Sequence, residues 1–231
     1  MVQILITGAN RGLGLEFVRQ YLDRGEKVVA TFRENNDISD LEELQRKYPD
    51  FLTLVPMNIT SSDSRTKAFT EVKSKISGLD ILINNAGMTG KRELKFGDLH
   101  ADHMLEVFNV NAISAVLVAE QFSQLFKENS KIINISSWMG SISARENTTN
   151  FSYCASKAAL NMFTKLLSNS LRDKGIIVIP IHPGWVKTRM GTQSAPIEQK
   201  DSISGMIQII DSLTLEETGR FYDWQGNELA W

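Results

Sequence analysis

Short apolar runs alternate with helical patterns along most of the chain. The continuous apolar composition of most runs is typical of strands that are covered on both faces of a sheet. The expected strands are Val2–Thr7, Lys27–Phe32, Phe51–Met57, Asp80–Asn84, Lys131–Ser136 and Ile176–His182. Helical spacing of apolar residues predicts helices over Gly12–Arg24, Ile38–Tyr48, Ser61–Ser77, Ala101–Glu128 and Phe151–Lys174.

Glycine and proline follow several of these helices. Left-handed caps or helix breakers are expected at Gly25, Pro49, Gly78 and Gly175. Beyond His182 the pattern weakens, and we expect a short helix over Lys200–Leu213 and a last strand over Gly219–Asp223. The βαβα order predicts an α/β fold, namely a single doubly wound, Rossmann-type domain over residues 1–231. The expected domain has a parallel sheet of about seven strands with helices on both faces.

Composition excludes several classes of protein. A net charge of −2 gives no indication of a nucleic-acid partner. The single cysteine, Cys154, excludes an intrachain disulfide framework. His100 and His103 lack an obvious third ligand, so we interpret them as a solvated or half-buried pair and expect no metal site. No targeting segment or membrane span is evident, which favours a cytoplasmic protein.

A glycine-rich turn follows the first expected strand directly. Gly8, Gly12 and Gly14 stand in the pattern TGxxxGxG, immediately before a helical pattern that continues from Leu15. A phosphate can approach the first N–H groups of a helix only where no Cβ blocks the backbone. The turn therefore predicts a phosphate-binding element, although a glycine-rich βα turn can also be ordinary loop chemistry.

Tyr153 and Lys157 lie four residues apart at the start of a helical pattern. This spacing places both side chains on one helix face, where an ammonium group lowers the pKa of a phenol. The pair can therefore act as a proton donor with its own tuning charge. Taken alone, the same spacing also arises by chance in a surface tyrosine and lysine.

Other polar residues follow the expected strands, where ligands of such sheets bind. They include Ser136-Ser137, the turn Asn84–Gly87 and the loop that contains Pro183, Gly184 and Thr188. Asn111 lies inside an expected helix, where asparagine is unfavourable. It either bends the helix or bonds inward, and the alternative is an ordinary residue on a polar helix face. Each of these motifs is weak evidence alone. Together they indicate a ligand site, because they follow successive strands of the expected sheet.

Together these motifs resemble the short-chain dehydrogenase/reductase family over essentially the whole chain. The matching motifs are TGANRGLG, NNAG at 84–87, Asn111, the serine pair, YCASK at 153–157, and Pro183-Gly184 with Thr188. The segment His182–Thr188 and the ending Gly226–Trp231 resemble the branch of sniffer-type carbonyl reductases and C-factor proteins.

The resemblance implies roles for a catalytic set. Tyr153 would protonate the carbonyl oxygen as hydride arrives, and Lys157 would lower the Tyr153 pKa and hold the nicotinamide ribose. Ser137 would hydrogen-bond the substrate oxygen, and Asn111 would hold a water that relays protons to Lys157.

The resemblance also implies a cofactor path along the strand ends. Thr188 would hold the carboxamide of the nicotinamide. Besides Tyr153 and Lys157, the expected cofactor-binding residues are Gly8, Asn10, Arg11, Gly12, Leu13, Gly14, Phe32, Arg33, Asn58, Ile59, Asn85, Ala86, Gly87, Pro183, Gly184, Val186 and Thr188.

Two departures from the family pattern concern the ligands. Asn58 replaces the aspartate that often follows the third strand and contacts the adenine, and a neutral amide can still hydrogen-bond. The segment from Ser137 to Tyr153 is a few residues longer than usual, so it weakens any inference about the substrate.

Two arginines favour the phosphorylated cofactor. An acidic residue at the end of the second strand would repel a 2′-phosphate, but this position is Phe32, followed by Arg33. Arg11 lies in the glycine turn itself, and guanidinium groups suit phosphate. We therefore expect NADP(H), the alternative being that both arginines are ordinary surface charges.

The sequence as a whole predicts an NADPH-dependent reductase of a small-molecule carbonyl compound. The alternative is a C-factor-like signalling or interaction protein that binds NADP(H) with little or no turnover. An epimerase or dehydratase is a third possibility. Such enzymes normally have a longer C-terminal substrate region and a different glycine spacing, and this chain has neither. Family members often pair through their long helices, so a homodimer or homotetramer is expected, with no membrane partner.

Overall fold

A computed structural model of the chain describes residues 1–92, 94–144, 146 and 149–231. Its centre is a seven-stranded sheet in the order β3-β2-β1-β4-β5-β6-β7, with all neighbouring strands parallel. The strands are β1 (Gln3–Ile6), β2 (Lys27–Phe32), β3 (Leu52–Pro56), β4 (Leu79–Asn84), β5 (Phe126–Ile135), β6 (Ile177–His182) and β7 (Tyr222–Asp223). The strand order reverses beside β1, so the carboxyl ends of β1 and β4 form the edge where ligands of such sheets bind.

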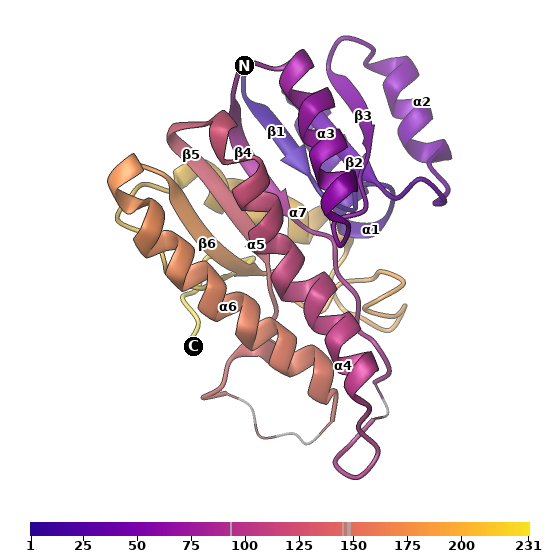
Figure 1. The fold of residues 1–231 in the computed structure, drawn as a ribbon, viewed down its shortest axis with the longest axis vertical. Helices are drawn as coiled ribbons and strands as arrows, with labels where there is room; N and C mark the ends of the chain where they lie inside the picture. Colours follow the sequence, from indigo (N-terminus) through magenta and orange to yellow (C-terminus); the bar gives the residue numbers. More distant parts are fainter. Residues whose placement is uncertain (93, 145, 147–148) are drawn as a thin grey trace.

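Helices cover both faces of the sheet, which confirms the predicted fold class (Figure 1). The helices are α1 (Gly12–Asp23), α2 (Ser39–Lys47), α3 (Ser62–Lys75), α4 (Ala101–Phe108), α5 (Ser114–Gln121), α6 (Phe151–Leu171) and α7 (Gln199–Ser212). One core layer joins the sheet to α1, α2 and α7, and the other joins it to α3, α5 and the inner side of α6. Alternate residues enter opposite layers, as Ile4 and Leu5 do.

The single helix expected over Ala101–Glu128 is wrong in two respects. A π-helical turn at Asn109–Ile113 separates α4 from α5, and α5 ends at Gln121. After a short 3-10 turn, the chain becomes extended at Phe126, which pairs with Leu79 of β4. The polar sequence after Phe126 is compatible with a helix, but pairing with the neighbouring strand overrides its local preference.

The other boundaries lie close to the expected ones. Gly25 and Gly175 adopt left-handed φ angles of +74° and +68°, which confirms two of the predicted caps. The last strand contains only Tyr222–Asp223, so the expectation of Gly219–Asp223 was too long. Within the described part of the chain, no helix combines the length and the apolar character needed to cross a lipid bilayer.

Candidate active site at the carboxyl edge of the sheet

The turn between β1 and α1 is shaped for an anion. Gly8 and Gly12 have φ angles of +64° and +56°, which disfavour other residues. A Cβ on Gly14 would lie 2.4 Å from the carbonyl oxygen of Gly8, so only glycine fits there. No side chain caps the first turn of α1, so its first N–H groups have no side-chain acceptor. These donors and the free backbone surface fit a phosphate group.

Hydrogen bonds tie this turn to the end of β4. The hydroxyl of Thr7 accepts from the backbone N–H groups of Asn85 and Ala86, each at 3.0 Å. The Asn85 amide donates to the carbonyl oxygens of Thr7 at 2.8 Å and Gly8 at 3.1 Å. The expected cofactor-binding segments at Gly8–Gly14 and Asn85–Gly87 therefore form one rigid edge across the switch in strand order.

An open cleft lies beside the turn, on the β2 side. It has a volume of about 280 Å³, and Asn10, Arg11, Asp37 and Arg189 are among the residues that line it. Asn10 donates to the carbonyl oxygen of Asp37 at 3.1 Å, which joins the turn to the segment after β2. The cleft thus contains the predicted residues Asn10 and Arg11.

Two other predicted residues follow directly at the end of β2. Phe32 is buried at the end of the strand, whereas Arg33 is exposed. Phe32 therefore occupies the position at which an acidic residue would repel a 2′-phosphate, and its ring packs into the core. Arg33 presents its charge to solvent just beyond that ring.

Asn58 and Ile59 lie where β3 ends. The Asn58 amide oxygen accepts from the backbone and hydroxyl of Thr60, at 3.2 Å and 2.9 Å. Ile59 is buried, and its carbonyl oxygen accepts from Arg65 at 2.7 Å. The Asn58 side chain is exposed at the carboxyl end of β3 and bonded within its own turn.

Ser137, Tyr153 and Lys157 come together at the ends of β5 and α6. Ser137 follows β5, and its hydroxyl is hydrogen-bonded to Tyr153. Lys157 is 5 % exposed and lies one helical turn further along α6, with Nζ 5.8 Å from the centre of the Tyr153 ring. Its ammonium group donates to the carbonyl oxygen of Ile135 at 2.8 Å. The predicted spacing on one helix face is thus observed.

The electrostatics differ from the expectation for this pair. Burial raises the pKa of Tyr153 above its ordinary value, and the Ser137 hydrogen bond and the Arg92 charge only partly oppose this rise. Burial also lowers the pKa of Lys157 to about 8. The net shift of the Tyr153 pKa is thus opposite to the expected lowering, because removal of the phenol from water is the largest effect.

Asn111 is buried and bonds inward from the π-helical turn. Its Oδ1 accepts from the N–H of Met88 at 2.8 Å, and its Nδ2 donates to the Met88 carbonyl oxygen at 2.8 Å and to the Ser156 hydroxyl at 3.0 Å. A Cβ on Gly87 would lie 3.3 Å from Asn111 Oδ1 and 3.8 Å from Lys157 Nζ. The prediction that Asn111 bends the helix or bonds inward is thus confirmed, and Asn111 lies beside the Tyr153–Lys157 pair.

The loop after β6 lies over the glycine turn. A Cβ on Gly12 would be 3.9 Å from the Thr188 methyl group. Thr188 accepts from the N–H of Gly191 at 2.8 Å, and the buried Val186 forms a bridge with Ile197. Gly184 has a φ of +83°, and the Pro183 carbonyl oxygen accepts from Ser202 at 2.6 Å. These contacts place Thr188 beside the glycine turn, whereas Pro183 and Val186 contact Ser202 and Ile197.

The sequence did not identify three residues that shape the site. Met88 and Ser156 hold Asn111, and Arg92 donates a hydrogen bond to the carbonyl oxygen of Met190 across the site. Ser156 lies inside the YCASK motif, which is a local signal for it. Met88 contributes only backbone atoms, and Arg92 is an ordinary loop residue in the sequence, so neither has a local signal.

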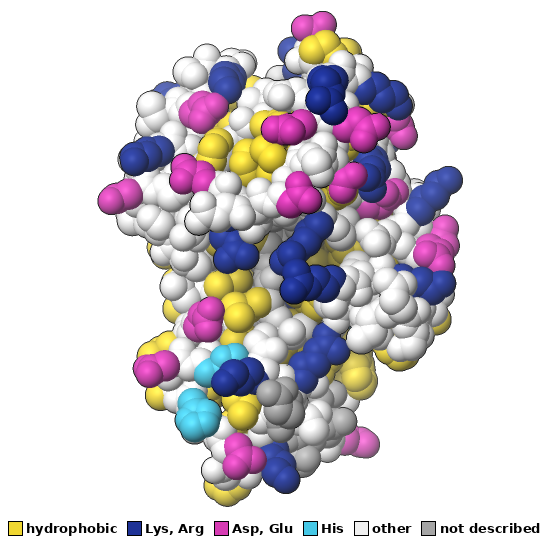
Figure 2. Space-filling view, turned by 90° about the vertical axis from the view of Figure 1, so that its right-hand side faces the viewer, with side chains coloured by type: hydrophobic (Ala, Val, Ile, Leu, Met, Phe, Trp, Pro, Cys, Tyr) yellow, Lys and Arg dark blue, Asp and Glu magenta, His cyan; other side chains and the backbone are white. Residues whose placement is uncertain are grey.

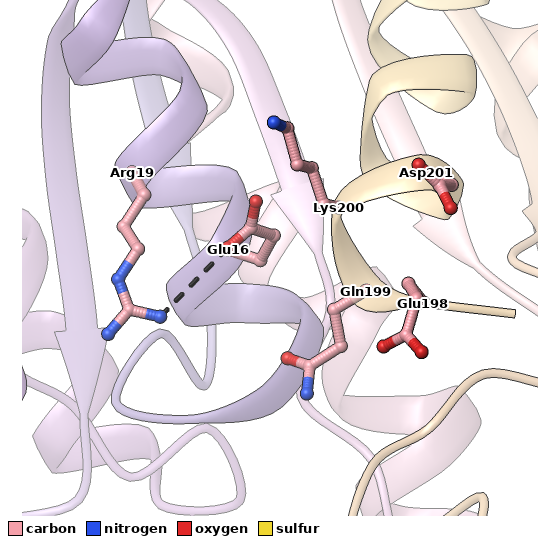
Figure 3. A pocket seen from close by; sticks show the side chains of 6 residues that line it. All are labelled: Glu16, Arg19, Glu198, Gln199, Lys200 and Asp201. Atoms are coloured by element: carbon pink, nitrogen blue, oxygen red, sulfur yellow. Dashed lines mark ion pairs between the residues drawn. The ribbon is translucent and has the colours of Figure 1, made fainter.

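A second cleft lies away from this chemistry, between α1 and the start of α7 (Figure 3). Glu16 and Arg19 project from α1, and Glu198, Gln199, Lys200 and Asp201 line the opposite side. Glu16 and Arg19 form a loose ion pair at 3.9 Å. This cleft contains none of the predicted catalytic residues. Among the residues with described positions, no group of three His, Cys, Asp or Glu side chains could hold a metal.

Comparison with known families and sequences gives consistent results. A family model described as short chain dehydrogenase matches residues 3–199. C-signal of Myxococcus xanthus is 37% identical over 155 residues, which are 66% of this chain and 93% of that protein. An uncharacterized oxidoreductase of Schizosaccharomyces pombe is 31% identical over 245 residues, covering 96% of this chain and 94% of its own.

Solved structures extend the likeness over the whole chain. An NADPH-bound carbonyl reductase from chicken fatty liver has a TM-score of 0.92 and 35% identity, covering 99% of this chain and 98% of its own. The carbonyl reductase Sniffer of D. melanogaster has a TM-score of 0.95 and 30% identity, with 100% of each chain covered.

Proposed function

The chain belongs to the short chain dehydrogenase family of oxidoreductases, and we propose that it is an NADPH-dependent reductase of aldehydes or ketones. The observation that carries the proposal is the hydrogen-bonded pair of Ser137 and Tyr153, with Lys157 one helical turn away, beside an uncapped glycine turn. A phosphate anchor and a proton donor therefore share one edge of the sheet.

The cofactor-binding residues divide by the part of the molecule they would hold. The N–H groups of the glycine turn would hold the pyrophosphate, Arg11 and Arg33 the 2′-phosphate, and Lys157 with Thr188 the nicotinamide half. When bound, the reduced nicotinamide supplies a hydride to the carbonyl carbon. The similar chicken carbonyl reductase is described with NADPH bound, which supports this assignment.

The side chains supply the proton and orient the carbonyl. Ser137 donates a hydrogen bond to the substrate oxygen, and Tyr153 gives its proton to the same oxygen, leaving a phenolate. With hydride added to carbon and a proton to oxygen, the product is the alcohol. The Lys157 ammonium stabilises the phenolate, and Asn111 fixes the segment at Met88 that forms the wall opposite α6.

Tyr153→Phe tests the mechanism, because the variant keeps the ring and loses only the hydroxyl. We expect turnover of an accepted aldehyde or ketone to fall by about 10²–10⁴-fold, the usual contribution of a positioned acid. NADPH binding, followed by its fluorescence, should change little. Near-normal turnover by Tyr153→Phe would refute the role of Tyr153.

A second candidate function rests on the similarity to C-signal. On this hypothesis the protein binds NADP(H) with little or no turnover and acts through interactions. The buried set of Ser137, Asn111 and Lys157 favours the reductase, because a binding protein needs no such set. Tight NADPH binding without turnover on a broad panel of carbonyl compounds would favour the second function.

We also propose that the protein forms a homodimer or homotetramer. Leu105 on α4 and Met162 and Leu166 on α6 are 65%, 61% and 53% exposed, which supports an interface on these helices. Light scattering at micromolar concentration tests this, and a monomeric mass would contradict it.

A further inference from the structure

Arg92 connects two loops that lie on either side of the candidate active site. It belongs to the segment between β4 and α4, and its guanidinium donates to the carbonyl oxygen of Met190 in the loop after β6. The two residues are 98 positions apart in the chain. Arg92 therefore connects the segment after β4 to the loop after β6.

The base of the loop after β6 is held by several contacts. The N–H of Lys187 donates to the Ile197 carbonyl oxygen at 2.8 Å, and the Gln199 amide donates to the Lys187 carbonyl oxygen at 2.8 Å. The tip, residues 188–195, has fewer. Among the residues with described positions, Arg92 is the only one outside the loop that forms a hydrogen bond with this tip. Trp185 at the base of the loop also donates to Gly191, and Arg92 adds the connection between the tip and the segment after β4.

The Arg92 charge also acts at the reacting atoms. It lies close enough to Tyr153 to lower the pKa of the phenol, against the larger effect of burial. No carboxylate in the described part of the chain forms an ion pair with Arg92, whereas Lys187 in the loop after β6 pairs with Glu198. An arginine carries several N–H donors in a planar fork, and one bond to Met190 leaves others available.

The surroundings of Arg92 are basic. Lys91 precedes it, and Arg11 and Arg189 line the cleft beside the glycine turn. Figure 2 shows Lys and Arg side chains gathered across the middle of the face that carries these loops. The cleft also carries Asp37 and Asp40, whereas Lys91 and Arg92 carry only positive charge, which attracts an anionic ligand. A bound dinucleotide phosphate would neutralise Arg11, but not Arg92, which lies on the Tyr153 side.

We propose that Arg92 is a specificity-determining residue of this site, and that the favoured substrates are carbonyl compounds that carry a carboxylate. This inference rests on the proposed reductase function. The guanidinium would bind the carboxylate while its bond to Met190 keeps the loop tip closed over the substrate. The carbonyl group would then lie between Ser137 and Tyr153, and hydride and proton would be added there as for any other carbonyl compound.

The test compares an oxo acid with its methyl ester, so that the carbon skeleton and the carbonyl group are the same. Both compounds are assayed with NADPH and with wild type, Arg92→Gln, Arg92→Lys and the matched control Lys95→Gln. Lys95→Gln removes one charge from the same loop without touching Met190. Thermal unfolding of each variant checks that it is folded.

We expect wild type to prefer the acid, and Arg92→Gln to lower kcat/KM for the acid by about 10- to 100-fold. The same variant should change kcat/KM for the ester by less than about threefold, and Arg92→Lys should retain part of the preference, because it keeps the charge but loses the fork. Added salt should weaken the preference in wild type and not in Arg92→Gln.

Three results would overturn the proposal. An equal fall for acid and ester in Arg92→Gln would make Arg92 a purely structural latch. Preference of wild type for the ester, or an equal effect of Lys95→Gln, would remove the role of Arg92 in recognition. These results leave the reductase function intact. Failure of wild type to reduce either compound would overturn this inference, and failure on the broad panel of carbonyl compounds would remove the reductase function as well.

Discussion

The side-chain amide of Asn111 satisfies both backbone hydrogen-bonding groups of Met88, at 2.8 Å in each direction. The same amide holds the Ser156 hydroxyl, which in turn donates to the carbonyl oxygen of Tyr153 at 2.8 Å. A single buried side chain thus connects the segment after β4 to the helix that carries Tyr153 and Lys157. This explains why an asparagine stands where helix propensity disfavours it, and why the helix opens into a π turn there.

Asn111→Ala should destabilise the protein by about 2–3 kcal/mol, because it leaves polar groups of Met88 without partners. It should also lower kcat/KM, since the wall at Met88 loses its anchor. Urea unfolding and steady-state kinetics measure both effects. Asn109→Ala is the matched control in the same π turn, because the Asn109 side chain only accepts from Ser114 at 3.3 Å. Equal losses in the two variants would contradict the special role of Asn111.

Gly14→Ala should prevent cofactor binding. The new Cβ would meet the Gly8 carbonyl oxygen at 2.4 Å and the Asn85 amide nitrogen at 2.5 Å, so the turn must shift. Overpacking of this kind costs about 1–3 kcal/mol, more than the roughly 1 kcal/mol that alanine gains over glycine in a helix. NADPH titration and thermal unfolding test it.

Gly25→Ala is the control for the previous variant, because Gly25 has a φ of +74° and no atom within 4 Å of its added Cβ. It should cost about 1 kcal/mol from backbone strain and leave NADPH binding unchanged. If Gly14→Ala bound NADPH as tightly as this control, the close approach at Gly14 would have no function.

Arg33→Ala should weaken the use of NADPH more than that of NADH. Arg33 is exposed directly after the buried Phe32, and its loss removes a charge that suits the 2′-phosphate. We expect kcat/KM with NADPH to fall about tenfold and kcat/KM with NADH to change little. The exposed Arg46 on α2 provides the control Arg46→Ala. A wild-type preference for NADH would refute the choice of cofactor.

Lys157→Met should alter the pH dependence of stability. The folded-state pKa of Lys157 is about 8, below the ordinary value of 10.5, so the unfolded chain binds this proton more tightly. The cost of burying the charge is therefore fully present below pH 8 and disappears as the pH rises toward 10.5. Relative to Lys157→Met, wild type should gain about 3 kcal/mol across this window.

Urea unfolding of wild type and Lys157→Met at several pH values measures this gain. The exposed Lys95→Met controls for the loss of a surface lysine. Parallel stability curves for wild type and Lys157→Met would show that the Lys157 pKa is not lowered in the folded protein.

Sequence patterns predict best the elements whose conformation follows from their own residues, such as strands that are buried on both faces of the sheet. The sequence predicts the strand Lys27–Phe32 and the start of α6 at Phe151 correctly, because apolar composition and helical spacing are local properties. It does not predict the extended segment at Phe126–Asn129, because that conformation comes from Leu79 and Ser130. Ser130 accepts from the Lys127 N–H at 2.8 Å and donates to the Leu79 carbonyl oxygen at 2.7 Å.

The residues of the candidate site also fall into two groups, those with a local sequence signal and those that only the fold brings together. Tyr153 and Lys157 were predicted because one helix turn separates them, and the glycine turn because its chemistry is local. Arg92 and Met190 were not, because only the fold brings them together. The direction of the Tyr153 pKa shift was also missed, since burial depends on the residues packed around the phenol.

The place of β1 in the centre of the sheet has a consequence for how the protein is made. β1 pairs with β2 on one side and with β4, beginning at Leu79, on the other (Figure 1). During synthesis, β1 therefore keeps one open edge until β4 has been made. Parallel pairs of this kind are distant in sequence, so the sheet closes late and slowly. The nascent phosphate-binding turn cannot be completed before Asn85 arrives, and cofactor binding should therefore report on closure of the whole central sheet.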